Sequence, residues 1–206
     1  MSPGDVHVVG TRTFAAEVVG YARDAGIEVA GLVEPYEGAE TGALVHDLPV
    51  TRLGDEPAGE RRTAILGTGD TDRRELVERV RAAGWELAGL IHPRAHVAAS
   101  STVDATAVIG PAVVVGACAR VGAHSVLGRG ALVGHHTAIG AFCTLGPGAN
   151  VAGNVRVEDG ALIAMGAVVR DHTTVGAGAV VAMGAVVVDD VPPAVEVRGI
   201  PARRTD

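Results

Sequence analysis

The chain has no lysine and almost no aromatic side chains. All 17 basic residues are arginine, and aromatic residues make up 2% of the 206 positions. The missing lysine excludes a lysine nucleophile or Schiff base. Rings are scarce although 48% of the residues are hydrophobic and 29 are glycine. This composition favours thin, closely stacked layers over a sandwich or a helical bundle.

Disulfides, net positive charge and long apolar runs are also missing. The two cysteines, Cys118 and Cys143, are too few for a disulfide framework and fit a reducing cytosol. A net charge of −7 gives no support to nucleic-acid binding. The sequence shows no signal peptide and no apolar run of about 18 residues. We therefore expect a cytoplasmic protein that has neither a nucleic acid nor a membrane as partner.

The second half of the chain repeats a pattern of aliphatic and small residues every six positions. Every sixth residue from Val97 to Val187 is aliphatic over sixteen repeats, and the residue two positions before each is small. A short fixed period indicates a solenoid. Short strands with a turn every six residues predict three strands in each coil, and the coils stack at a spacing of roughly 4.8 Å. The aliphatic and small side chains then fill a triangular prism of about five coils.

Residues 1–92 follow a different pattern. Helical stretches at 14–25 and 71–83 alternate with apolar runs that predict strands at Val6–Val9, Val29–Val33, Ala64–Leu66 and Leu87–Ile91. Strands that alternate with helices indicate a small α/β unit with a short parallel sheet. We therefore divide the chain into a Rossmann-like α/β domain, residues 1–92, and an all-β solenoid with a C-terminal tail, residues 93–206.

The hexad pattern resembles the left-handed parallel β-helix of the hexapeptide-repeat acyltransferases. The α/β unit before it narrows the resemblance to the bacterial nucleotide-amino-sugar N-acetyltransferases, which are grouped with the sialic-acid O-acetyltransferase-like proteins. The residues that carry it are Ile91-His92-Pro93, Val133–Gly140, Ala152–Val155 and the tail Gly199–Arg203. It spans essentially the whole chain. The resemblance implies a homotrimer that transfers acetyl from acetyl-CoA, bound between neighbouring prisms, to the amine of a nucleotide-linked amino sugar.

The resemblance also implies roles for residues near His135. His135 matches the general base, which takes a proton from the amine during direct attack on the thioester; imidazole suits this because its ordinary pKa of about 6.5 is near working pH. His136 stands where the family usually has an acidic residue and would assist, or exchange roles with His135. Gly153 lies one coil after His135, and its N–H would bind the thioester carbonyl. Thr144, which replaces a family histidine, is placed with Gly153 on the acyl side.

Further contacts follow from the same resemblance. The residues implied to bind acetyl-CoA are Gly166, Met183, Gly184, Arg198 and Arg203, and those implied to bind the nucleotide sugar are Gly10, Thr11, Glu34 and Asp70. Three other residues receive structural assignments from their positions. We expect His92 at the domain junction, His124 in a surface turn and Cys143 in the core.

Other functions on the same fold stay open. One is O- or N-acylation of an acceptor that lacks a nucleotide, and another is a catalytically silent trimer that binds CoA or a nucleotide. The prism also resembles the γ-type carbonic anhydrases, but His136 and His172 lie two coils apart, roughly 9.6 Å. Zn–N bonds of about 2.1 Å do not span that distance within one chain, and the family's third histidine is Ala177 here. We therefore expect no metal.

Overall fold

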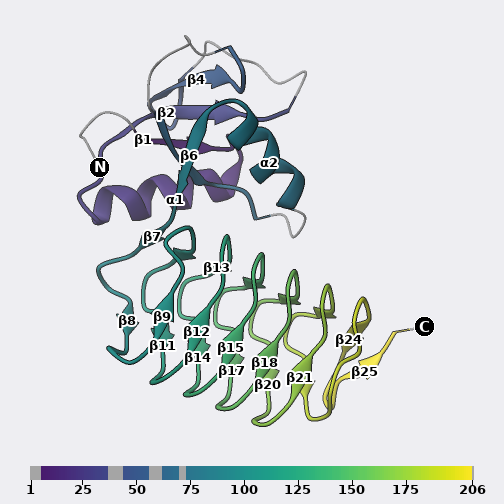
Figure 1. The fold of residues 1–206 in the computed structure, drawn as a ribbon. Helices are drawn as coiled ribbons and strands as arrows, with labels where there is room; N and C mark the ends of the chain where they lie inside the picture. The colour runs from purple at the N-terminus through teal and green to yellow at the C-terminus, as the bar shows by residue number, and fades with distance from the viewer. Residues whose placement is uncertain (1–5, 37–43, 56–61, 70–72, 206) are drawn as a thin grey trace.

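A computed structural model describes residues 6–36, 44–55, 62–69 and 73–205. An α/β domain is seated on one face of a three-sided parallel β-helix, which carries the C-terminus at its far end (Figure 1). The predicted fold class is confirmed in both parts. None of the described helices is long and apolar enough to cross a membrane.

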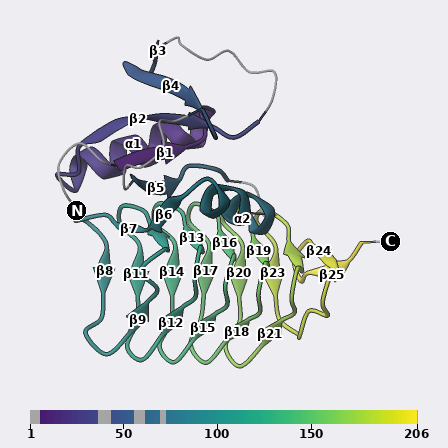
Figure 2. The same cartoon turned by 45° about the horizontal axis from the view of Figure 1, so that its top comes forward.

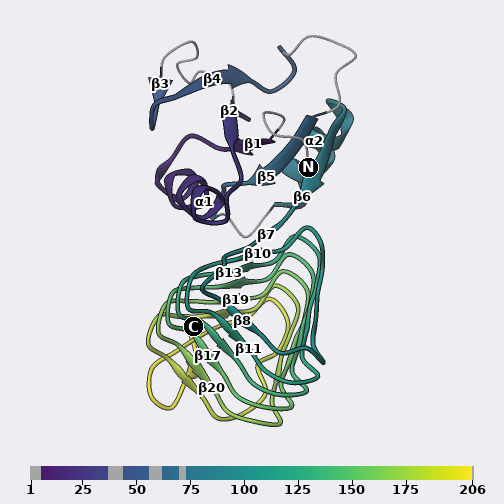
Figure 3. The ribbon, with the colours of Figure 1, turned by 90° about the vertical axis from the view of Figure 1, so that its left-hand side faces the viewer.

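The α/β domain is built on one sheet with the strand order β3-β4-β2-β1-β5-β6. All strand pairs are parallel except β3 with β4. Two helices cover opposite faces of the sheet (Figure 3). The elements are β1 (Val6–Val9), α1 (Thr13–Asp24), β2 (Val29–Glu34), β3 (Leu44–Val45), β4 (Leu48–Arg52), β5 (Arg62–Leu66), α2 (Arg74–Ala82) and β6 (Trp85–Ala88).

Alternation along β1 explains how one sheet takes a helix on each side. Neighbouring side chains of a strand point to opposite faces. Val8 packs in the cluster that contains α1, and Val9 packs in the cluster that contains α2. The apolar runs predicted from the sequence are therefore strands that are buried on both faces.

The β-helix has three sheets, one on each side of a triangular prism (Figure 3). The domain face contains β7 (Leu90–Ile91), β10 (Val108–Ile109), β13 (Val126–Leu127), β16 (Thr144–Leu145), β19 (Leu162–Ile163), β22 (Val180–Val181), β24 (Glu196–Arg198) and β25 (Arg203–Arg204). The apolar face contains β8 (His96–Val97), β11 (Val114–Val115), β14 (Leu132–Val133), β17 (Asn150–Val151), β20 (Val168–Val169) and β23 (Val186–Val187). The arginine face contains β9 (Thr102–Val103), β12 (Arg120–Val121), β15 (Ala138–Ile139), β18 (Arg156–Val157) and β21 (Thr174–Val175).

Each of the sixteen predicted hexads supplies one short strand, from β8 to β23. The ladder pairs residues one coil apart, as in Val115 with Val133. From Ile109 to Val187 the aliphatic position is 0–4% exposed, and the small position beside it, as at Ala149, is buried as well. Val97 and Val103 at the open end of the prism are only partly buried. A core of stacked aliphatic rows thus holds the coils in register.

The chain crosses from one domain to the other at Gly89. The single strand predicted for Leu87–Ile91 is divided here, because β6 pairs with β5 whereas β7 pairs with β10 of the prism. The Gly89 N–H donates to Ala105 O, and a Cβ on Gly89 would lie 2.1 Å from Ala107 O. No other residue fits so close an approach. The prism therefore begins at Leu90, and the division at residue 92 stays a prediction.

His92 holds the junction together, as expected. Its side chain is 1% exposed and its Nδ1 accepts a hydrogen bond from the Arg94 N–H at 3.0 Å. Nδ1 is thus the acceptor, so Nε2 carries the proton and donates to Asp24 of α1 at 3.0 Å. This imidazole ties the end of α1 to the start of the prism.

The α/β domain lies over the domain face and buries the outward side chains of its first three strands, β7, β10 and β13 (Figure 2). Leu90, Val108 and Val126 point outward from the prism and join the same apolar cluster as α1. Burying a side chain of this size contributes on the order of 2 kcal/mol. The two domains therefore share a continuous apolar interface.

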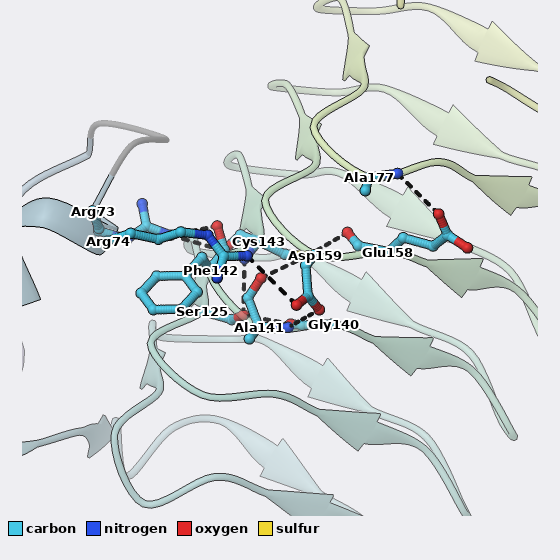
Figure 4. Close-up of polar contacts among 10 residues, drawn as sticks. All are labelled: Arg73, Arg74, Ser125, Gly140, Ala141, Phe142, Cys143, Glu158, Asp159 and Ala177. Carbon is cyan, nitrogen blue, oxygen red and sulfur yellow. Dashed lines mark hydrogen bonds and ion pairs between the residues drawn. The ribbon is translucent and has the colours of Figure 1, made fainter. Parts of the chain in front are cut away.

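Arg73 anchors the N-terminal end of α2 to the prism and is fully buried. Its guanidinium donates to the carbonyl oxygens of Phe142 at 3.1 Å and Cys143 at 3.0 Å (Figure 4). It also donates to the carbonyl oxygen of His124 at 3.3 Å and to the hydroxyl of Thr144 at 2.9 Å. The fork of donors on arginine suits such a set of acceptors. The turn residues of the prism are thereby fixed beneath α2.

His124 differs from expectation. It was predicted in a surface turn, but its side chain is 4% exposed because α2 covers it. Arg81 of α2 donates to its Nε2 at 3.2 Å, and the Phe142 ring lies 5.1 Å away between centroids. Cys143, in contrast, is in the core as predicted, and burial raises the pKa of its thiol to about 11. A buried thiol of this kind is not a nucleophile at neutral pH.

Candidate functional site

The two adjacent histidines lie on the edge between the apolar face and the arginine face. We call it the histidine edge; its turns are formed by residues 117–118, 135–136, 153–154 and 171–172. His135 and His136 follow β14 and precede β15, and His136 has a φ of 58°. The turns are linked from coil to coil: His136 N–H donates to Ala117 O, and Asn154 N–H donates to His135 O. Both imidazoles are exposed to solvent.

Gly153 lies directly against the His135 ring. A Cβ on Gly153 would be 2.7 Å from Nε2 and 2.7 Å from Cε1 of His135. Any larger residue would displace the ring. In the part of the chain that the structure describes, the N–H of Gly153 donates to no protein acceptor. The edge thus presents an imidazole beside an unpaired peptide N–H.

The two imidazoles form a hydrogen bond through their Nδ1 atoms, which are 3.1 Å apart. One Nδ1 carries the proton and the other accepts it. If His135 donates, its Nε2 has a free lone pair on the side of Gly153, and His136 carries its own proton on Nε2. The His135 ring can then accept a further proton without breaking the bond to His136. Chemically, the arrangement can take a proton from one group while it stabilises an oxyanion on another.

Thr144 does not lie with Gly153, which corrects its predicted position on the acyl side. It is the outward residue of β16 on the domain face, where its hydroxyl accepts the hydrogen bond from Arg73. The side chain is therefore covered by the α/β domain. Its sequence distance from His135 placed it on another face of the prism.

The residues predicted to bind acetyl-CoA lie on other parts of the β-helix. Gly166, Met183 and Gly184 are on the methionine edge, which joins the domain face to the apolar face through the turns at 147–148, 165–166 and 183–184. Met183 is 72% exposed. Arg198 and Arg203 are exposed on β24 and β25, and Arg203 donates to Ala202 O at 2.8 Å. One chain does not bring these residues to the histidine edge.

Three of the four residues predicted to bind the nucleotide line one cleft. Gly10, Thr11 and Glu34 border a cavity of about 220 Å³ at the carboxyl ends of β1, β2 and β5. The carboxylate of Glu34 is 4% exposed; it accepts from the Thr11 hydroxyl and from the Tyr36 N–H at 2.9 Å. Asp70, the fourth, lies outside the described residues.

The cleft also contains residues that the sequence reasoning missed. The hydroxyl of Thr68 lines the cavity, is buried and has no partner among the described residues. The first turn of α1 opens on the same cavity, with no side-chain cap and no acidic residue. Such a helix start, at the switch point of a parallel sheet, is a site for anions such as phosphate. The Gly67-Thr68-Gly69 turn was the sequence signal for it.

Among the described residues, no group of three or more His, Cys, Asp and Glu side chains is placed to hold a metal ion. His172, two coils after His136 on the histidine edge, has its Nδ1 2.9 Å from Asp171. Its ring therefore has a partner of its own.

Solved structures match the chain over its whole length. PerB from Caulobacter crescentus, in complex with CoA and GDP-perosamine, is 30% identical; the match covers 100% of this chain and 99% of that one, with a TM-score of 0.91. A histidine-to-alanine variant of GDP-perosamine N-acetyltransferase from the same organism, with the same ligands, is 29% identical, with coverages of 100% and 98% and a TM-score of 0.91. The acetyltransferase domain of PglB from Neisseria gonorrhoeae, in complex with acetyl coenzyme A, is 29% identical, with coverages of 99% and 100% and a TM-score of 0.89. No protein-family model and no curated protein matches the chain.

Proposed function

The chain belongs to the left-handed β-helix N-acetyltransferases of the nucleotide-amino-sugar family, which use acetyl-CoA, and from this premise we propose its acceptor and its mechanism. The acceptor is the amine of a nucleotide-linked amino sugar. His135 is the general base, and the N–H of Gly153 stabilises the oxyanion. The observation that carries this proposal is the His135 imidazole packed against Gly153, whose N–H has no acceptor among the residues that the structure describes.

The reaction is a direct attack without a covalent enzyme intermediate. The amine nitrogen attacks the thioester carbonyl while Nε2 of His135 takes the amine proton, and a C–N bond forms. The carbonyl oxygen becomes an oxyanion that accepts a hydrogen bond from Gly153. The C–S bond then breaks, and the CoA thiolate receives the proton from His135, which regenerates the base.

His136 assists by accepting the Nδ1–H of His135. The Nδ1–Nδ1 distance of 3.1 Å supports this role. The hydrogen bond fixes both the tautomer and the orientation of the base, as a carboxylate does in other acid–base pairs. A neutral imidazole stabilises the protonated base less than a carboxylate, because it carries no negative charge.

The cleft of the α/β domain binds the nucleotide part of the acceptor. Three features of this cleft support nucleotide binding. The first is the start of α1, where the N–H groups have no side-chain cap and suit a phosphate group. The second is the Thr68 hydroxyl, which has no partner among the described residues. The third is the carboxylate of Glu34, which Thr11 and Tyr36 hold in place. A diphosphate and its sugar offer acceptors for the first two.

We propose a homotrimer, in which the methionine edge of one protomer meets the histidine edge of the next. Along the apolar face the outward side chains of Val114 and Leu132 are neighbours on successive coils and are 38% and 40% exposed. Beyond the exposed Asn150, Val168 is 38% exposed, and Met183 on the border of the face is 72% exposed. Adjacent apolar residues on a surface mark an interaction site. The trimer would bring Gly166, Met183 and Gly184, the proposed contacts of acetyl-CoA, to the His135 of a neighbour. Light scattering on Leu132→Glu tests it: the expected result is a fall from three chains to one.

A thermal-shift panel tests the acceptor. A ligand that binds only the folded protein at about a hundred times its Kd adds about 2.7 kcal/mol to the unfolding free energy. Acetyl-CoA and at least one nucleotide amino sugar are expected to raise the Tm separately, and the same pair should yield an acetylated amine by mass spectrometry. A shift with acetyl-CoA alone would contradict a nucleotide acceptor. Shifts with both ligands and no product would favour the silent trimer.

A further inference from the structure

Thr137 is a buried hydroxyl directly under the turn that contains Gly153. Its side chain is 0% exposed. The hydroxyl donates to the Ala152 carbonyl at 2.7 Å and accepts from the Val155 N–H at 3.2 Å. Thr137 itself touches neither solvent nor the imidazole of His135, so nothing in the proposed mechanism uses it directly.

The bond to Ala152 fixes the direction of the Gly153 N–H. Ala152 O and Gly153 N belong to one peptide group, which is trans. In a trans peptide the C=O and N–H bonds point in opposite directions. Because Thr137 holds the carbonyl toward the interior, the N–H of Gly153 points away from the interior, out of the turn. The backbone of Gly134 lies close against this peptide, because a Cβ on Gly134 would be 2.5 Å from Gly153 N.

We propose that Thr137 is a positioning residue for catalysis, which orients the Gly153 peptide so that its N–H meets the thioester oxyanion; this inference rests on the proposed function. An oxyanion donor is effective because its direction is set before the reaction. A peptide without this hydroxyl keeps its N–H but can rotate away from the productive direction.

The domain edge is formed by the turns at 123–124, 141–142, 159–160 and 177–178. It contains the same hydroxyl-to-peptide arrangement, and there the outward peptide N–H has an acceptor. The Ser125 hydroxyl donates to Gly140 O at 2.8 Å and accepts from Cys143 N–H at 3.0 Å, at the same sequence separations as Thr137 (Figure 4). The peptide that it orients presents the Ala141 N–H outward, and this N–H donates to a carboxylate oxygen of Asp159 at 2.9 Å. In this chain, therefore, the arrangement already delivers an N–H to a negatively charged oxygen.

The hydroxyl alone does not produce the arrangement. Thr173 occupies the equivalent position two coils after Thr137 on the histidine edge. Its hydroxyl, however, donates to Arg170 O within its own turn at 2.6 Å. Val155, between them, has no hydroxyl. Among these residues only Thr137 bonds to the peptide of the following coil. The orientation is thus specific to the turn that contains Gly153.

Steady-state kinetics of three variants test the proposal, with acetyl-CoA and the most active nucleotide amino sugar of the thermal-shift panel. Thr137→Val is expected to lower kcat about tenfold, with an unchanged KM for acetyl-CoA, because removal of a whole oxyanion donor costs about 100-fold or more. Thr137→Ser keeps the hydroxyl and should restore kcat. Ser125→Ala removes the matched hydroxyl at the domain edge. It should lower the Tm about as much as Thr137→Val does, while kcat stays unchanged.

An NMR measurement separates orientation from activity. The carbonyl ¹³C signal of Ala152 should shift in Thr137→Val and not in Thr137→Ser. A Thr137→Val enzyme with the wild-type kcat would overturn the inference alone. A wild-type protein that acetylates no amine in the panel would overturn the proposed function and the inference with it.

Discussion

Two histidines occupy the same position of the repeat and have different surroundings. His124 and His136 are both the second residue of a turn, with φ values of 56° and 58°. His124 is buried beneath α2 with its Nε2 on Arg81, whereas His136 is exposed with its ring against His135. The backbone of the β-helix is therefore the same at each edge. What lies over the turn decides whether its histidine is structural or available for chemistry.

The polar groups of the two edges show the same difference. At the domain edge, Asp159 takes the outward N–H of Ala141, Glu158 takes that of Ala177 at 3.0 Å, and Arg73 binds three turn carbonyls (Figure 4). At the histidine edge, the outward N–H of Gly153 has no acceptor among the described residues. Buried polar groups are normally paired. An open donor beside an exposed imidazole therefore distinguishes the histidine edge, where we propose the reaction, from the domain edge.

The largest expected effect follows from replacing His135. His135→Asn keeps the volume and polarity of the ring but removes the base, and kcat should fall by about 10² to 10⁴-fold. His172→Asn is the matched control on the same edge, because the His172 side chain is exposed and its Nδ1 lies 2.9 Å from Asp171. Its kcat should equal that of the wild type, measured by release of free thiol from CoA. Equal losses in both variants would mean that the edge, and not one imidazole, is required.

Gly153→Ala should give the next largest loss. The added Cβ meets His135 at 2.7 Å, but the ring is the exposed end of a side chain and can swing into solvent. We therefore expect kcat to fall about 100-fold, by displacement of the base and crowding of the acyl group, with the Tm almost unchanged. Gly20→Ala on α1, where a Cβ meets nothing within 4 Å, serves as the control. An unaffected kcat in Gly153→Ala would contradict the close packing of ring and glycine.

At the domain edge the expected effect is on stability. Arg73→Met removes the guanidinium that donates to the carbonyls of His124 and Phe142 and to the Thr144 hydroxyl, whereas the Cys143 carbonyl keeps its bond from the Val126 N–H. The unfolding free energy should fall by about 3 kcal/mol. Arg74→Met is the control: this side chain is about half exposed, stacks 4.3 Å above the Phe142 ring and pairs with Asp159 at 3.5 Å. Its loss should be about 1 kcal/mol or less. Urea denaturation measures both, and similar midpoints would show that the buried guanidinium is not the anchor.

The sequence predicted the repeating part of the molecule well. A six-residue period determines which residues are neighbours in space, because each residue stacks on the one a coil before it. The same rule placed Gly153 over His135 from their spacing alone. Most strands and both helices of the α/β domain were also predicted by their periodicity. The exceptions are β3, in a segment interpreted as loop with a short strand near Val50, and the break at Gly89, which depends on close contact with Ala107 of the prism.

The outward positions of the prism were less predictable. Thr144 and His124 were placed wrongly because their surroundings come from α2, which is more than forty residues away in sequence and docks by no periodic rule. The same holds for Arg73, whose partners are four turn and strand residues in the other domain. The proposed roles of Met183 and its neighbours require a second chain, and a single sequence does not specify how chains pack.

The smallest expected effect is on the pH dependence of stability, through His124. Burial lowers the pKa of this imidazole, Arg81 and Arg73 lower it further, and only Asp104 opposes them. Below about pH 6.5 the unfolded chain binds a proton at this position that the folded protein does not, so the unfolding free energy falls as the pH falls toward the folded pKa. Between pH 7.5 and 5.5 the wild type should therefore lose more stability in urea than His124→Gln. His136→Gln, at the equivalent but exposed turn, should follow the wild type; if His124→Gln does so as well, the cover provided by α2 has no effect on the titration of this turn.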